Sequence, residues 1–65
     1  MFKFNNAFHT KNKQVGMQFT DQKRVVSIYP DVKGIINIDC SEKPVTQEEG
    51  VEITKHYNRL VRFYK

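Results

Sequence analysis

Apolar and polar residues alternate along four stretches of the chain, near 2–8, 14–20, 24–29 and 34–40. A period of two is typical of β-strands that bury one face. The opposite face is mostly polar, so the pattern predicts a sheet with one apolar side. The residues expected on the apolar side are Phe2 and Phe4, with Phe8 as a further candidate, Val15, Met17, Phe19, Val26, Ile28, Ile36, Ile38 and Cys40.

Short connections link these stretches, and a helical crossover between parallel strands needs about a dozen residues or more. We therefore expect antiparallel neighbours joined by turns at "TDQKR" and "YPDVKG". In the second turn Pro30 and Asp31 favour the bend, and Gly34 can adopt a positive φ where the next strand begins. The segment "HTKNK" is a looser polar loop. The first strand could thus pair with the second or lie at an edge beside another strand.

After Cys40 the period changes to that of a helix, which we place at 46–64. Thr46 and Glu49 have the spacing of a capping box, in which each side chain accepts a hydrogen bond from the other residue's amide. Gly50 lies at the edge of the apolar stripe, where it predicts a close approach of the helix to the sheet or, alternatively, a local kink. The apolar stripe itself consists of Ile53, Tyr57, Leu60 and Tyr64, with Val61 beside it.

A sheet with one apolar face and a helix with one apolar stripe each need a cover, and each can cover the other. The expected fold is therefore α+β, a single two-layer ββββα domain over residues 1–65, with an antiparallel sheet of three to four strands.

The cysteine content and the first residues of the chain predict the cellular compartment. The single cysteine, Cys40, cannot form an internal disulfide, whereas short secreted domains usually carry an even set. The first residues lack the apolar core of a signal peptide, and no segment approaches the ~20 apolar residues of a membrane span. We expect a cytoplasmic protein that does not associate with membranes.

Few residues in the chain have catalytic potential. Cys40 and His56 could meet in space as nucleophile and base, but Cys40 continues the buried register of its strand and His56 has Glu52 one helical turn earlier. Spacing for a metal site or a phosphate-binding loop is absent from the sequence. We therefore expect no enzyme, no metal and no cofactor.

A basic stripe on the C-terminal helix is the first candidate binding surface. Lys55, Arg59 and Arg62 recur at helical spacing, with Lys65 and an exposed Phe63 beside them. This stripe could track phosphates or bind an acidic protein. Alternatively, it is a solvated face whose charges are partly neutralised by Glu48 and Glu52. The net charge of +4 favours acidic partners in general, but further lysines at the turns spread it around the chain.

The polar side of the sheet is the second candidate, with a mixed apolar and polar patch that suits a protein interface. Its residues are Gln18, Val25, Tyr29, Ile35 and Asn37. Only Tyr29 could stack on a base there, which disfavours single-stranded RNA as the ligand of this face. An exposed strand edge is the third candidate, because it could pair with a partner strand. A homodimer could form through such an edge or through the sheet face.

The chain is short and basic and forms one small domain, and in this it resembles many small proteins of phages and mobile elements that occlude a larger protein. This resemblance assigns no functional residues. Together with the lack of catalytic groups, it predicts a non-enzymatic protein-binding module, a small regulator or inhibitor. The alternative is a nucleic-acid-binding protein that uses Lys55, Arg59, Arg62 and Lys65.

Overall fold

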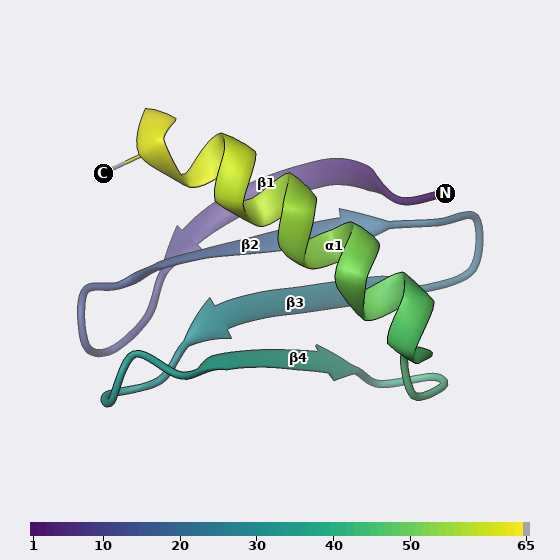
Figure 1. The fold of residues 1–65 in the computed structure, drawn as a ribbon, viewed down its shortest axis with the longest axis horizontal. Helices are drawn as coiled ribbons and strands as arrows, with labels where there is room; N and C mark the ends of the chain where they lie inside the picture. The colour runs from purple at the N-terminus through teal and green to yellow at the C-terminus, as the bar shows by residue number, and fades with distance from the viewer. Residues whose placement is uncertain (65) are drawn as a thin grey trace.

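Figure 1 shows a computed structural model of the protein, described over residues 1–64, in which one helix lies across one face of a sheet. The strands are β1 (Lys3–His9), β2 (Val15–Thr20), β3 (Val25–Pro30) and β4 (Ile36–Cys40). They are followed by α1 (Gln47–Leu60) and a short 3-10 helix, η1 (Val61–Phe63). The predicted α+β arrangement in the order ββββα is confirmed. No helix within residues 1–64 is long and apolar enough to cross a membrane.

The strands follow chain order, β1-β2-β3-β4, and each neighbouring pair is antiparallel. The first strand therefore pairs with the second, which the sequence left open. The turn between β3 and β4 forms as predicted, because the Asp31 carboxylate accepts hydrogen bonds from the amides of Lys33 and Ile35 at 2.8 and 3.0 Å. Gly34 has φ +85°, a conformation that favours glycine.

A β-bulge in β1 changes which side chains share a face. The pairing with β2 shifts between Phe4 and Asn6, so one extra residue is inserted in β1. Before the bulge, Phe4 pairs with Phe19 on the helix side; after it, Phe8 pairs with Gly16 on the opposite side. The prediction of Phe8 as a further candidate for the apolar face is therefore wrong. Its place on the helix side is taken by Ala7, which packs against the core.

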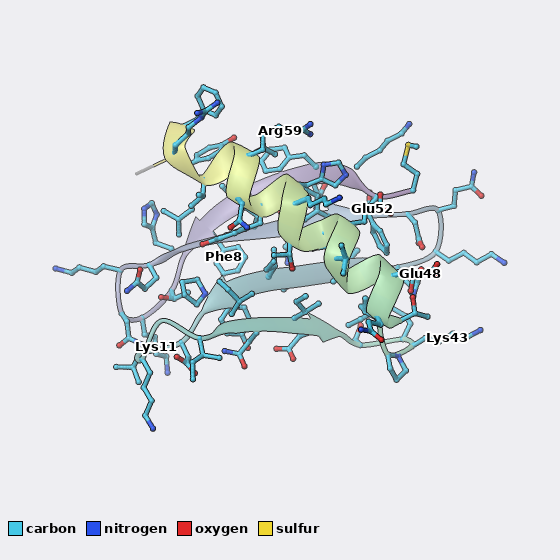
Figure 2. All side chains as sticks on the ribbon, viewed as in Figure 1. Phe8, Lys11, Lys43, Glu48, Glu52 and Arg59 are labelled. Atoms are coloured by element: carbon cyan, nitrogen blue, oxygen red, sulfur yellow. The ribbon has the colours of Figure 1, made fainter. Side chains whose placement is uncertain are left out.

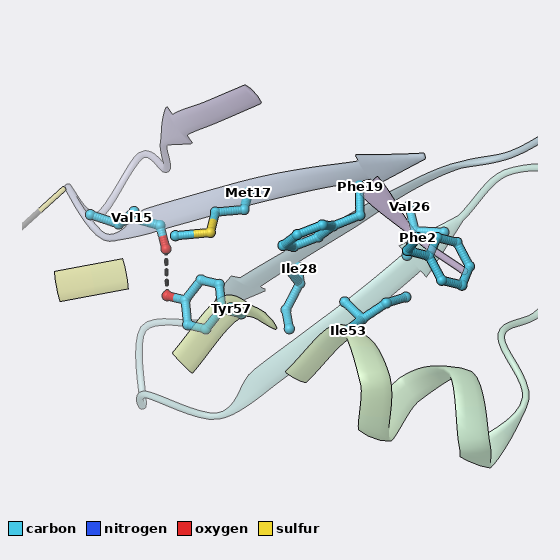
Figure 3. Close-up of a cluster of buried hydrophobic side chains, with 8 residues drawn as sticks. All are labelled: Phe2, Val15, Met17, Phe19, Val26, Ile28, Ile53 and Tyr57. Atoms are coloured by element: carbon cyan, nitrogen blue, oxygen red, sulfur yellow. Dashed lines mark hydrogen bonds between the residues drawn. The ribbon is translucent and has the colours of Figure 1, made fainter. Parts of the chain in front are cut away.

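The core lies between α1 and the covered face of the sheet (Figure 3). Ile53 and Tyr57 enter it from the helix, and the Tyr57 hydroxyl donates a hydrogen bond of 2.6 Å to the Val15 carbonyl oxygen. This bond satisfies the one polar atom that the tyrosine carries into the interior, and burial raises the pKa of its phenol. The buried side chains are Phe2, Val15, Met17, Phe19, Val26, Ile28, Ile53 and Tyr57.

The helix begins as predicted and ends earlier. Thr46 and Glu49 form the capping box, with hydrogen bonds of 3.1 and 3.2 Å between each amide and the other side chain. At the C-terminal end the last turn tightens into η1, so Tyr64 lies beyond the α-helix rather than on its buried stripe. Tyr64 is 42% exposed and stacks on Phe4, with ring centroids 6.0 Å apart.

Gly50 does not serve the close approach that its position predicts. A Cβ atom at this residue would lie 3.8 Å from the Ile38 Cδ1 atom, which is ordinary van der Waals contact. The helix therefore passes Ile38 at a distance that leaves room for a methyl group. The α-helix also continues for ten residues beyond Gly50, so this glycine does not interrupt it.

Candidate binding surfaces

The two residues with the most catalytic potential are kept apart by the sheet order. Cys40 lies at the end of β4, half-buried against the core, where it pairs with Val26. His56 instead packs against Phe19 of β2, with ring centroids 5.8 Å apart. The imidazole thus packs over β2, whereas the thiol belongs to β4, two strands away in the sheet. Within residues 1–64 there is also no group of three or more His, Cys, Asp or Glu side chains that could hold a metal.

The face of the sheet opposite α1, here called the open face, is not covered by any element of residues 1–64 (Figure 1). Strand register arranges its side chains in three rows across the strands. The row at one end contains Phe8, Gly16, Tyr29 and Asn37; the middle row contains Asn6, Gln18, Ser27 and Asp39; the row at the other end contains Lys3, Thr20 and Val25.

Two aromatic side chains flank a glycine in the first of these rows. The Phe8 ring lies against Gly16 so closely that a Cβ atom there would be 2.4 Å from the Phe8 Cζ atom. Figure 2 labels Phe8 among the side chains of the sheet. On the other side of β2, Tyr29 of β3 is the next residue along from Ile28. Because Ile28 pairs with Met17 and the strands are antiparallel, Tyr29 lies opposite Gly16. Glycine in a strand commonly marks such a close approach, and here Gly16 leaves free the space that the Phe8 ring occupies.

A shallow hollow of about 590 Å³ opens beside these two aromatic residues. The loop after β1 and the turn after β3 form its two rims, and Phe8 and Tyr29 both line it. Its rims carry His9, Lys11 and Asp31, so charges of both signs surround an apolar lining. This volume is within the range of cavities that accept a small ligand or a cluster of partner side chains, about 300–1,000 Å³.

Hydrogen bonds between neighbouring strands hold several open-face side chains in place. The Tyr29 hydroxyl donates to the Asp39 carboxylate at 2.6 Å, which raises the pKa of the phenol above its ordinary value. The Gln18 amide donates to the Ser27 hydroxyl at 3.4 Å. The aromatic row and the middle row are therefore ordered before any partner binds.

The apolar patch predicted on this face is rearranged. Val25, which is 43% exposed, lies in the last row, and the first row with Tyr29 is at the opposite end of the face. Ile35 is 59% exposed but lies in the turn before β4. Asn37 is beside Tyr29 as expected. The residue that sequence reasoning missed is Phe8, and the signal for it was Gly16, because glycine in a strand often marks the close approach of another group.

The basic stripe on the helix, here called the helix ridge, is formed by Lys55, Arg59 and Arg62 on the solvent-facing side of α1 and η1. All three are exposed, as is Phe63 at 69%, and the Arg62 guanidinium lies 5.4 Å from the centre of the Phe63 ring. The predicted fourth cation, Lys65, lies outside the described residues.

Two acidic side chains of α1, Glu49 and Glu52, have partners outside this ridge. Glu49 binds Arg24, and the Glu52 carboxylate accepts a hydrogen bond of 2.9 Å from the Phe2 amide. The Glu52 carboxylate also lies 3.5 Å from His56 Nε2, and His56 Nδ1 is 3.0 Å from an Arg59 guanidinium nitrogen. Among the described residues, no carboxylate forms an ion pair with the ridge cations. Of the two carboxylates expected to neutralise the ridge, Glu52 contacts Arg59 through His56, and Glu48 forms no ion pair with a ridge cation among the described residues.

A cluster around Arg24, which sequence analysis did not anticipate, joins the turn after β2 to the start of α1. The guanidinium forms ion pairs with Asp21 and Glu49 and lies 5.3 Å from the centre of the Phe2 ring. Amide donors and Arg24 lower the pKa of Asp21 to about 2, and the Arg24 hydrogen bonds lower that of Glu49 to about 2. A hollow of about 900 Å³ lies over this cluster, lined by lysines and carboxylates in similar number.

The two outer strands of the sheet differ as binding edges. β1 carries the bulge and Lys3, both of which discourage edge-to-edge pairing. β4 has the regular register of its pairing with β3 and carries neither lysine nor proline. Ile36, although on the helix side of β4, is 38% exposed because α1 crosses the sheet diagonally from the end of β4 toward β1 (Figure 1).

Comparison of the chain with protein-family models, with curated proteins and with solved structures gave no match. The candidate surfaces are therefore ranked by their geometry and chemistry.

Proposed function

We propose that the protein is a non-enzymatic protein-binding module, a small regulator or inhibitor that covers part of a larger protein with its open face. The observation that carries this proposal is the ordered row of Phe8 and Tyr29 beside an apolar hollow of about 590 Å³, on a sheet face that nothing in residues 1–64 covers. Aromatic side chains surrounded by a polar rim are the usual centre of a protein interface.

The partner contributes an apolar side chain that enters the hollow between Phe8 and Tyr29. Amide and hydroxyl groups of Gln18, Ser27 and Asn37 lie beside these aromatic residues on the open face and form the polar rim of the proposed interface. Because the Tyr29 hydroxyl is already bound to Asp39, little side-chain entropy is lost when the partner docks.

Affinity capture of partners from a cell extract, followed by binding measurements on variants with the partner identified, tests this proposal. Phe8→Ala and Tyr29→Ala should each weaken binding by about tenfold or more while leaving the circular dichroism spectrum unchanged. Phe63→Ala, an equally large truncation on the other side of the molecule, is the matched control. The proposal fails if the Phe63 change abolishes binding and the two open-face changes leave it intact.

Nucleic-acid binding through the helix ridge is the second candidate function. It is supported by the absence, among described residues, of carboxylates paired with Lys55, Arg59 and Arg62. Three phosphate contacts would give a salt dependence of about two to three decades of affinity per decade of salt. The triple change of these cations to glutamine should abolish such binding, and a lack of binding to DNA and RNA at low salt excludes this function.

A further inference from the structure

The outer edge of β4 carries an inference that is independent of the proposed function. Within residues 1–64 no strand pairs with this edge, so backbone amides and carbonyls along Ile36–Cys40 are open to a partner strand. The opposite outer strand, β1, has a bulge, a lysine and a covering contact between Phe4 and Tyr64. A bulge and a lysine therefore protect β1 against edge pairing, whereas β4 has neither, and its one charged side chain is Asp39.

Apolar side chains border the β4 edge on the helix side. Ile36, Ile38 and Cys40 share this side of the strand, and Ile36 is 38% exposed. A partner strand added at β4 would cover the exposed part of Ile36.

We propose that a second copy of the same chain occupies this edge, with the two β4 strands antiparallel and Ile38 on the two-fold axis. A two-fold axis perpendicular to the sheet keeps both helices on the same face. This register places Ile36 opposite Cys40 of the second copy and Asn37 opposite Asp39. Apolar residues then meet on the helix side, and the carboxylate meets an amide instead of its own copy. The result is one continuous sheet of eight strands, twice the four of a single chain.

Charge disfavours the neighbouring register, in which the two-fold axis lies one residue closer to the C-terminal end of β4. Moving the axis to Asp39 would bring two carboxylates directly opposite each other, which is destabilising. A pairing register shifted by an odd number of residues would place the apolar side chains of one copy beside the polar side chains of the other. The open face remains accessible in this dimer, so self-association and the proposed protein binding can fail separately.

Sedimentation equilibrium from micromolar to millimolar concentration tests the dimer. Ile36→Lys should raise the dimer dissociation constant about a hundredfold, because both copies carry the change and each lysine weakens edge pairing by about tenfold. Asn5→Lys, an exposed change on the β1 edge, should leave the constant unchanged. A wild-type chain that remains monomeric at millimolar concentration overturns the proposal, as does a dimer that both variants leave intact.

Cysteine cross-linking tests the register without relying on destabilised variants. In the variant Ile36→Cys, the introduced thiol should form disulfides with Cys40 of the second copy under mild oxidation, giving a covalent dimer. Within one chain the two positions are about 13 Å apart along the strand, too far for a disulfide. The double variant Ile36→Cys, Cys40→Ser should remain uncrosslinked. Equal cross-linking of both variants, or of neither, contradicts the register.

Discussion

The two faces of the sheet are built from alternate residues of the same strands but differ in how deeply their side chains are buried. On the covered face Met17, Phe19, Val26 and Ile28 are at most 1% exposed. On the open face Val25, one residue before Val26, is 43% exposed, and the Phe8 ring lies against Gly16. The covered face supplies stability and the open face is available for binding, so substitutions on the two faces should have separable effects.

The largest effect is expected for Ile53→Ala on the covered face. Ile53 is fully buried between the helix and the sheet, and removing its side chain should cost about 2–5 kcal/mol of unfolding free energy. A domain this short has a total stability of about 3–10 kcal/mol, so urea denaturation should show a protein near its limit. Val51→Ala, on the exposed flank of the same helix, should change stability by less than about 0.5 kcal/mol.

On the open face, Gly16→Ala should cost about 1–2 kcal/mol because the new methyl group requires the Phe8 ring to move. The reason can be isolated by a double-mutant cycle, since the cost should disappear when Phe8 is already alanine. Displacement of Phe8 should also weaken partner binding. An equal cost in both backgrounds would show that strand geometry, and not the ring, requires glycine.

Tyr57→Phe tests the buried hydrogen bond between α1 and β2. Loss of the 2.6 Å bond to Val15 leaves a buried carbonyl oxygen without its partner and should cost about 1 kcal/mol. Urea denaturation measures the change. Binding should be unaffected, because Tyr57 is on the opposite side of the sheet from Phe8 and Tyr29. A loss of affinity in this variant would contradict the separation of the two faces.

Gly50→Ala should stabilise the protein by up to about 1 kcal/mol. The added methyl group fits against Ile38, and alanine has a higher helix propensity than glycine. Gly34→Ala is the contrasting change: at φ +85° it should destabilise by about 1 kcal/mol, although its surroundings are open. Thermal denaturation should therefore shift the two melting temperatures in opposite directions.

Acid should weaken the attachment between the two layers at the Arg24 cluster, with the smallest effect of the series because the groups are near solvent. The folded pKa values of Asp21 and Glu49, about 2, are below their ordinary values of 3.8 and 4.5. Their contribution is therefore complete above about pH 4.5 and is lost as the pH falls toward 2.

Glu49→Gln tests this acid dependence, because glutamine preserves the capping box and removes the charge. Denaturant titrations between pH 2 and 6 should show a flatter pH dependence for this variant than for wild type. Glu48→Gln, in the same helical turn but exposed, is the matched control. Identical pH profiles for Glu49→Gln and wild type would exclude a role of the Arg24 ion pair.

Local patterns were sufficient for the elements of the fold. Alternation predicted all the strands, and Thr46 with Glu49 predicted the start of the helix, because these signals depend on residues close together in the chain. The turn chemistry of Asp31 and Gly34 was readable for the same reason. Burial then required the helix to cover the sheet, which determined the two-layer arrangement.

Only the tertiary structure decided the composition of the candidate site. The bulge near Asn5 moves Phe8 to the open face, and strand register places it beside Gly16 and near Tyr29. The Arg24 cluster joins residues 25 positions apart in the chain, Arg24 and Glu49. Such contacts depend on how strands pair and where the helix crosses them. The sequence by itself therefore determined which elements form and which side of each is apolar, whereas pairing and crossing determined which side chains meet.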